Sequence, residues 1–135
     1  MWSRCARLSE EKILPLGMPR TDKLLGHSKG DGHTILSSKR AYLYTPTFRW
    51  DSEPANFILD YDWLDGQLTN NEVFAVKAHM AGRKILNKKY KHIVEIPSTE
   101  PSIPYLYDCD IVITDYSSII FDGYLLGKPA ILFEK

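Results

Sequence analysis

The chain has 135 residues, of which 44% are hydrophobic, and its 17 basic and 17 acidic residues give a formal net charge of zero. This length and composition are typical of one globular domain with its own core, and the balanced charge argues against wholesale binding to nucleic acid. No apolar run approaches the length of a membrane span, so we expect any membrane contact to be peripheral or to involve parts outside this chain. The two cysteines, Cys5 and Cys109, fit neither a disulfide framework nor a zinc site, which favours a reducing, cytoplasmic location.

In chain order, the first expected elements are a short helix and a Gly-rich linker, GHSKGDGHT at 26–34, which together form a lead-in over residues 1–34. Runs of β-branched and aromatic residues then predict strands at 41–45, 73–76, 92–96, 111–114 and 129–133. Helices are predicted at 60–68, 101–108 and 117–126. Short apolar strands that alternate with helices are typical of an α/β domain with a parallel, doubly wound sheet, here over residues 35–135. Since the last predicted strand lies at the end of the chain, we expect this domain to be incomplete at its C-terminus and the chain to be part of a larger protein.

Polar side chains follow three of the predicted strands, at the point where each strand ends. Thr47 and Arg49 follow the first strand, Lys77 and His79 follow the second, and the polar run 115–118 follows the fourth. In a parallel sheet the carboxyl ends of the strands lie at one edge, where ligands bind. We therefore expect these groups to converge on one site.

The segment DYSSIIFD at 115–122 has more polar groups than a strand, a turn and a helix require. Either Ser117 or Ser118 suffices as N-cap of the following helix, and the second hydroxyl, beside the helix N-terminus, suits a phosphate oxygen. Asp122 follows one helical turn later, so its carboxylate can hold a sugar or polyol hydroxyl on the same side. The alternative interpretation is a double cap with an exposed Asp122.

Lys77 and His79 alternate along the chain and so share one face at the end of their strand. The lysine can neutralise a diphosphate and the histidine can act as an acid or a base, although a structural role for His79 is the alternative. Basic residues gather in 77–91 and acidic residues in 51–72, which indicates either two solvated faces or an anion-facing basic segment. The segment Pro19–Asp22 is compatible with a helix start, with Thr21 or Asp22 as its cap.

The run from Asp110 to Asp122, followed by LGKP at 126–129, closely resembles the signature of the CDP-glycerol glycerophosphotransferase family, the teichoic-acid primases and polymerases of bacterial cell walls. Segments 19–22, 44–49 and 77–79 are similar to further motifs of that family, in the same order. The resemblance implies a GT-B glycosyltransferase-type fold, with two Rossmann-like domains and the active site between them. Residues 35–135 would then be the C-terminal, donor-binding domain, a Rossmann-like parallel sheet with flanking helices.

The resemblance also implies an activity and a site. Enzymes of this family transfer glycerol phosphate from CDP-glycerol to a growing teichoic-acid-type polymer and release CMP. The positions that match the family's donor site are Arg20, Thr47, Lys77, His79, Ser117, Ser118 and Asp122. Lys77 and His79 would face the diphosphate beside the two serines, and Asp122 would hold glycerol or ribose hydroxyls. No metal or other cofactor is expected, because cations and a helix N-terminus can take up the negative charge of the reacting phosphate.

Two features depart from the family pattern. Met80-Ala81-Gly82 stand where the family usually has a proline after the histidine. The catalytic base of the family is expected to be a histidine of an N-terminal domain, so we expect the isolated chain to be inactive. By the same resemblance, the parent protein would bind CDP-glycerol and a polyol-phosphate polymer acceptor at the inner face of the cell membrane. The alternatives are a GT-B domain that uses CDP-ribitol or a UDP-sugar, and a non-catalytic nucleotide-binding module.

Overall fold

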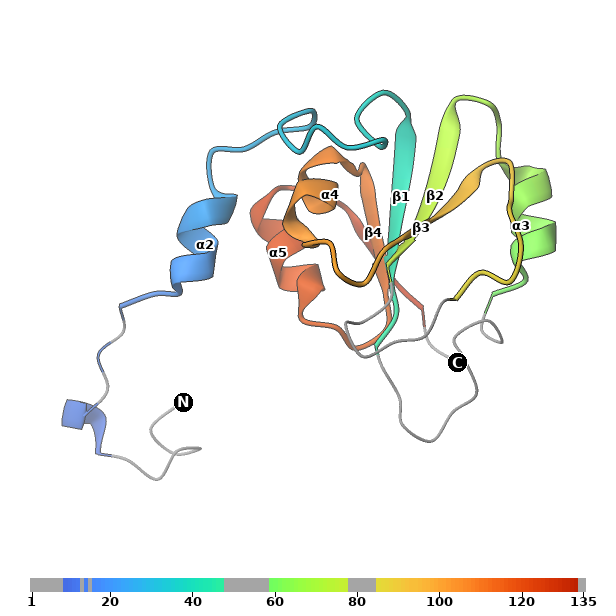
Figure 1. Ribbon diagram of the computed structural model, residues 1–135. Coiled ribbons are helices and arrows are strands. Elements are labelled where there is room, and N and C mark those ends of the chain that lie inside the picture. The colour runs from blue at the N-terminus through green and yellow to red at the C-terminus, as the bar shows by residue number, and fades with distance from the viewer. Residues whose placement is uncertain (1–8, 13, 15, 48–58, 78–84, 134–135) are drawn as a thin grey trace.

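The computed structural model describes residues 9–12, 14, 16–47, 59–77 and 85–133, and the account below concerns these ranges. Their centre is a five-stranded sheet in the order β3-β2-β1-β4-β5, in which every neighbouring pair is parallel (Figure 1). The strands are β1 (Arg40–Thr45), β2 (Glu72–Lys77), β3 (Ile93–Ile96), β4 (Ile111–Thr114) and β5 (Ala130–Leu132). All five predicted strands and the parallel α/β class are confirmed.

Helices lie on both faces of the sheet (Figure 1). One side holds α4 (Ile103–Asp108) and α5 (Ile119–Leu125), with α2 (Pro19–Leu24) packed on α5, and the other side holds α3 (Tyr61–Gln67). A short 3-10 helix, η1 (Glu10–Lys12), precedes α2. The helices predicted at 60–68, 101–108 and 117–126 are confirmed. None of the helices within the described ranges is long and apolar enough to cross a membrane.

The predicted cap of α2 is wrong. The helix begins at Pro19 with Met18 in the N-cap position, so Thr21 and Asp22 lie inside the first turn. Proline is favoured at the first position of a helix because its φ is preset and its missing N–H would be unpaired there in any case. This preference outweighs the capping tendency of the two polar residues that follow.

Alternation along the strands divides the core into two layers. Leu43 of β1 packs with the α4 and α5 side, in a cluster that also holds the fully buried Cys109. Tyr44, the next residue, packs on the opposite face with Tyr61 of α3. Burial on both faces explains why the strands read as continuous apolar runs rather than as an alternating pattern.

The acidic helix α3 is paired with part of the basic segment. Asp60 caps the helix by accepting a hydrogen bond from the N–H of Trp63 at 3.0 Å. Asp62 forms an ion pair with Lys88, and Asp65 accepts a hydrogen bond from the N–H of Lys91 at 3.1 Å. Among the described residues, the acidic helix is thus joined to the basic segment by the Asp62–Lys88 ion pair and by a backbone hydrogen bond to Asp65.

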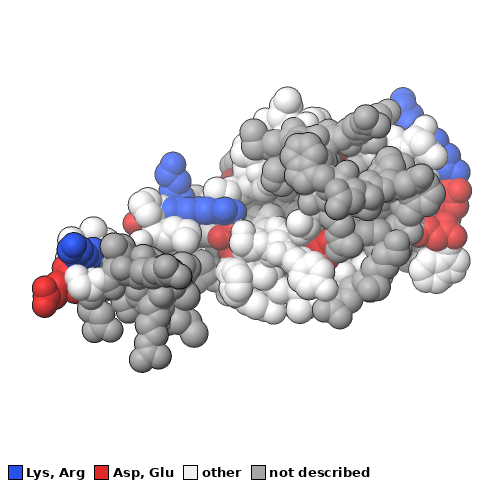
Figure 2. Space-filling view, turned by 90° about the horizontal axis from the view of Figure 1, so that it is seen from below, with Lys and Arg blue, Asp and Glu red and all other residues white. Residues whose placement is uncertain are grey.

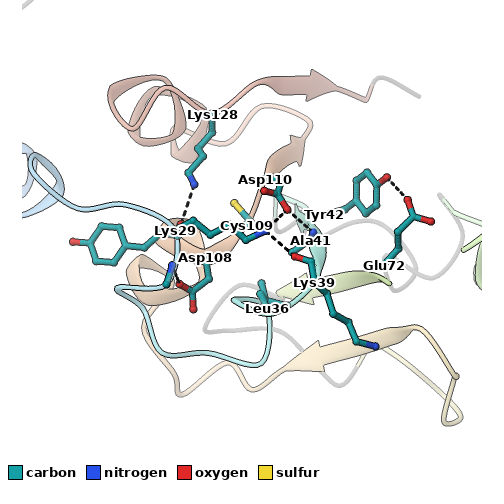
Figure 3. A network of polar contacts seen from close by, with 12 residues as sticks. Lys29, Leu36, Lys39, Ala41, Tyr42, Glu72, Asp108, Cys109, Asp110 and Lys128 are labelled. Atoms are coloured by element: carbon teal, nitrogen blue, oxygen red, sulfur yellow. Dashed lines mark hydrogen bonds and ion pairs between the residues drawn. The ribbon is translucent and has the colours of Figure 1, made fainter. Parts of the chain in front are cut away.

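Two acids connect the segment before β1 to the rest of the domain (Figure 3). Asp108, at the end of α4, accepts hydrogen bonds from the N–H groups of Gly30 and Gly32 at 2.9 and 3.1 Å and from the hydroxyl of Thr34 at 2.6 Å. Asp110 accepts a hydrogen bond from the N–H of Ala41 at 2.8 Å and pairs with Lys29. Residues on both sides of the predicted boundary at 34/35 are thus bound to the same short stretch, 108–110.

Candidate functional site

The ends of three neighbouring strands bring polar residues together at the carboxyl edge of the sheet. Thr45 of β1 is level with Thr114 of β4. On the other side of β1, Tyr44 is the register partner of Val76 in β2, so Lys77, the next residue of β2, lies beside Thr45. All three polar residues are at least nine-tenths buried. The carboxyl ends of β2, β1 and β4 therefore lie next to one another at one edge of the sheet.

Thr47 and Asp115 are in direct contact at this edge. The carboxylate oxygen Oδ1 of Asp115 accepts hydrogen bonds from the N–H of Thr47 at 2.9 Å and from its hydroxyl at 2.6 Å. Asp115 is 6% exposed, whereas Thr47 lies at the surface. Burial raises the pKa of Asp115, but the bonds from Thr47 and the N–H of Tyr116 outweigh it, so this pKa lies below its usual value.

Arg20 and Asp122 form an ion pair that joins α2 to α5. The side chain of Arg20 is 45% exposed, and that of Asp122 is 11% exposed. Burial raises the pKa of the Asp122 carboxyl, and the guanidinium of Arg20 offsets part of the rise. The interpretation with an exposed Asp122 is therefore wrong, because α2 covers this side chain and supplies its cation.

The two serines lie just before α5. Ser118 holds the predicted N-cap position, but its side chain makes no capping hydrogen bond. Its backbone is helical, with φ −63° and ψ −10°, whereas a capping residue normally has an extended backbone that turns its oxygen back to the helix. The hydroxyl of Ser117 lies 3.5 Å from the N–H of Ile119, at the limit of a hydrogen bond. The side chain of Ser118 is exposed at the surface.

Lys77 is buried at the end of β2, with 6% of its surface exposed. Its Nζ donates a hydrogen bond to the carbonyl oxygen of Pro97 at 2.9 Å, which fixes the ammonium group beside the end of β3. Burial lowers the pKa of Lys77, and the nearby carboxylate of Glu100 partly counteracts this. His79 and Arg49 lie outside the described residues.

Figure 2 shows the carboxyl edge from below, since the strands in Figure 1 run downward. Basic side chains lie next to acidic ones at the α2 end of this view, and a second group of basic and acidic side chains lies at the opposite end. On the α2 side, Arg20 is paired with the acid Asp122.

The pairing of Asp115 with Thr47 was not predicted. The sequence marked both residues as polar groups that follow strands, and the missing signal was that β1 and β4 are neighbours with Thr45 opposite Thr114. In the same way, the sequence alone did not reveal that Asp122 forms an ion pair with Arg20. Contacts of this kind depend on strand order and on the position of α2.

Comparison with known proteins supports a family. The whole chain, residues 1–135, matches the family described as CDP-Glycerol:Poly(glycerophosphate) glycerophosphotransferase. The chain is 31% identical to the teichoic acid poly(glycerol phosphate) polymerase of Bacillus spizizenii, over 96% of this chain and 37% of that protein. It is 30% identical to the teichoic acid poly(ribitol-phosphate) polymerase of the same organism, over 92% of this chain and 22% of that protein.

A solved structure gives the same result. The wall teichoic acid polymerase TagF, in a variant soaked with CDPG, superposes with a TM-score of 0.73 and 27% sequence identity, over 96% of this chain and 34% of that chain. The chain therefore spans little more than a third, at most, of these relatives. It belongs to the CDP-glycerol:poly(glycerophosphate) glycerophosphotransferase family, and its fold is one Rossmann-like half of the GT-B type.

Proposed function

We propose that this chain is the donor-binding part of a transferase that moves glycerol phosphate from CDP-glycerol to a growing teichoic-acid-type polymer. Its family is that of the teichoic-acid polyol-phosphate transferases. The observation that carries the proposal is the meeting of family-like segments at the carboxyl edge, where Arg20 contacts Asp122 and Thr47 contacts Asp115. In open α/β sheets this edge is where ligands bind.

The cations of the site are suited to a diphosphate. Lys77 is held in place by Pro97, so its charge is positioned before a ligand arrives. Arg20 remains 45% exposed although Asp122 holds it, and a guanidinium can bind one carboxylate while it also donates to a phosphate. We assign these two cations to the diphosphate, with the hydroxyls of Ser117 and Ser118 beside it.

The proposed reaction is a phosphoryl transfer. A hydroxyl of the acceptor attacks the β-phosphorus of CDP-glycerol, the bond from this phosphorus to the bridging oxygen breaks, and CMP leaves with that oxygen. The proton of the attacking hydroxyl passes to a base, which we place in an N-terminal domain, and His79 is our candidate in this chain for a second acid or base. Catalysis of this type depends mainly on positioning and on charge stabilisation.

The remaining partners follow from the same proposal. The acceptor is a polyol-phosphate polymer, and the parent protein works in the cytoplasm at the inner face of the membrane. We expect no CMP release from the 135-residue chain alone. A second donor, CDP-ribitol, is also a candidate because the chain is almost equally similar to a poly(ribitol-phosphate) polymerase and a poly(glycerol phosphate) polymerase.

An amide NMR titration of the labelled chain tests the proposal, with CDP-glycerol, CDP-ribitol, CMP and UDP-N-acetylglucosamine as ligands. We expect CDP-glycerol to cause the largest shifts, and to cause them at Thr47, Lys77 and 117–122. Removing the charge with Lys77→Met should weaken this binding at least tenfold, since a charged hydrogen bond to phosphate is lost. Lys88→Met is the matched control, because Lys88 pairs with Asp62 of α3, and it should bind as the wild type does.

Each other result of this titration leads to a different conclusion. Larger shifts with CDP-ribitol would change the polyol and keep the reaction. Shifts with the UDP-sugar alone would replace the donor class. A folded chain that responds to none of the four ligands would contradict donor binding by this chain.

A further inference from the structure

The exposed hydroxyl of Thr47 is held by a buried acid. Both the N–H and the hydroxyl of Thr47 are bonded to the same oxygen, Oδ1 of Asp115, at 2.9 and 2.6 Å. The two contacts fix the backbone and the side chain of Thr47 together, just after the end of β1. Because Asp115 is 6% exposed and follows β4 directly, it is a rigid anchor for a residue that itself faces solvent.

This contact determines which hydrogen bonds Thr47 can still make. A threonine hydroxyl has one proton and two lone pairs, and an ionised carboxylate only accepts hydrogen bonds. The pKa of Asp115 lies below its usual value, so the carboxylate is ionised at neutral pH and the proton of Thr47 points to it. Only lone pairs remain on the exposed side of the Thr47 oxygen.

An oxygen with only lone pairs selects among the groups of a nucleotide donor. The diphosphate of CDP-glycerol is esterified at both ends, so its non-bridging oxygens carry no protons at neutral pH; they are also acceptors and cannot pair with the Thr47 oxygen. An alcohol group of a polyol or a ribose has its own proton and can donate a hydrogen bond to the Thr47 oxygen. The Thr47 oxygen therefore discriminates between ligand groups by whether they supply a proton to it.

We propose that Asp115 is a positioning residue that holds the hydroxyl of Thr47 as an acceptor for an alcohol group of the donor, while Lys77 and Arg20 take the diphosphate. This inference rests on the donor-binding function proposed above. It separates the site into a cationic part for the phosphates and an acceptor part for a hydroxyl. Asp115 itself does not touch the ligand and acts through Thr47.

The first experiment needs no ligand. In a pH titration of the labelled chain by NMR, the amide proton of Thr47 should shift with the ionisation of one carboxyl, with its midpoint below 3.8, the value of an unperturbed aspartate. Asp115→Asn should abolish this titration and leave the fold intact, because the amide oxygen of asparagine can accept the same two hydrogen bonds. A Thr47 signal that does not follow a carboxyl in the wild type would overturn the positioning role.

The second experiment measures dissociation constants for CDP-glycerol, CDP and inorganic diphosphate with the wild type, Thr47→Val and Thr47→Ser. We expect Thr47→Val to raise the dissociation constant for CDP-glycerol about tenfold, which corresponds to one hydrogen bond. The dissociation constant for inorganic diphosphate should stay within about twofold of the wild-type value. Thr47→Ser keeps the hydroxyl and should bind nearly as the wild type does. If Thr47→Val weakens the binding of CDP as well, the group bound by Thr47 is a ribose hydroxyl. If it weakens the binding of CDP-glycerol alone, that group is a glycerol hydroxyl.

A double-mutant cycle separates positioning from a general structural effect. In the wild-type background, Asp115→Ala should weaken the binding of CDP-glycerol. In the Thr47→Val background it should cause little further loss of affinity, because both changes remove the same contact. Asp115→Asn should restore most of the affinity, which also covers the case in which Asp115→Ala fails to fold. Additive losses in the cycle would overturn the inference.

The inference and the proposed function fail in different ways. If Thr47→Val weakens inorganic diphosphate as much as CDP-glycerol, Thr47 binds phosphate, so the inference is wrong while donor binding stands. If the wild type binds none of the three ligands, donor binding by this chain is contradicted, and the assignment of Thr47 to a donor hydroxyl is contradicted with it. The ligand-free titration then still decides whether Asp115 positions Thr47.

Discussion

At the scale of single residues, two buried threonines at the ends of β1 and β4, Thr45 and Thr114, differ in whether their hydroxyl groups are hydrogen-bonded. Thr114 donates its hydroxyl to the carbonyl oxygen of Thr45 at 2.7 Å, and both residues are buried. The hydroxyl oxygen of Thr45 itself is buried, and it has no hydrogen-bond partner among the described residues. An unpaired buried hydroxyl destabilises a fold, whereas a paired one is close to neutral or stabilising.

The isosteric change from threonine to valine distinguishes these two positions. We expect Thr114→Val to lower the free energy of unfolding by about 1 kcal/mol, because a buried hydrogen bond is lost. Thr45→Val should leave it within about 0.5 kcal/mol or raise it, because no hydrogen bond is lost and an apolar group fills the same space. Urea denaturation of the two variants checks this. Equal destabilisation would show that the Thr45 hydroxyl is paired in solution.

At the scale of elements, the Gly-rich segment packs closely against α4. A Cβ atom on Gly32 would lie 2.0 Å from the carbonyl oxygen of Pro104, which is far inside van der Waals contact. Asp108, at the other end of the same helix, accepts a hydrogen bond from the N–H of Gly32 at 3.1 Å. The hydrogen bonds to this carboxylate draw the segment onto the helix, and glycine is the residue that permits the close approach.

A pair of alanine substitutions tests this packing. Gly32→Ala should lower the free energy of unfolding by more than about 2 kcal/mol, because the new methyl group meets backbone atoms that cannot rotate away. Gly66→Ala is the control in α3, where no atom of the described part of the chain lies within 4 Å of the added Cβ. It should stabilise the chain by up to about 1 kcal/mol through better helix propensity. Thermal or urea unfolding that ranks Gly32→Ala level with Gly66→Ala would contradict the close packing.

At the scale of the whole molecule, buried carboxylates connect parts of the chain that are distant in sequence. The buried Asp108 and the partly buried Asp110 hold the segment before β1, and the buried Asp115 holds Thr47 just after it. In each case burial raises the pKa of the carboxyl, and hydrogen bonds outweigh this, so the pKa lies below its usual value. Asp122 is the opposite case, because burial dominates and its pKa is raised.

These pKa shifts predict that the protein loses stability in acid. A carboxyl whose folded pKa lies below its unfolded value of 3.8 stabilises the fold fully above about pH 5, and this contribution is lost as the pH falls through 3.8 to the folded pKa. The raised pKa of Asp122 has the reverse effect, because its ionisation opposes folding near neutral pH and this opposition disappears in acid. Three carboxyls outweigh one, so the free energy of unfolding should fall between pH 5 and pH 2.

Urea denaturation across this pH range measures the effect. Asp108→Asn should reduce the acid dependence, and Asp31→Asn should change it much less, because Asp31 is exposed and contacts Ser28 and His27, which are close to it in the chain. A free energy of unfolding that is constant from pH 5 to pH 3 would contradict the assigned roles of these carboxylates.

Local sequence patterns were sufficient for the elements and for the type of sheet. The strand at 111–114 and the strand at 73–76 are short apolar runs bounded by polar or turn residues, which is the pattern of strands covered on both faces. The same patterns placed Thr47, Lys77 and Ser117 after strand ends, and the parallel sheet put those ends at one edge. The cap of α2 was predicted wrongly, and of the two serines offered as cap of α5 it is Ser117, not Ser118, whose hydroxyl accepts from the N–H of Ile119. Such details depend on backbone angles that residue type alone does not set.

The sequence was therefore enough to predict that Thr47, Lys77 and Ser117 lie at the edge of the sheet, because strand ends are local properties of the chain. Which of these residues meet was decided by the tertiary structure. Asp115 meets Thr47 because β4 lies beside β1, and Asp122 meets Arg20 because α2 packs on α5. Burial of each acid, and hence the direction of its pKa shift, follows from these long-range contacts, which no local pattern encodes.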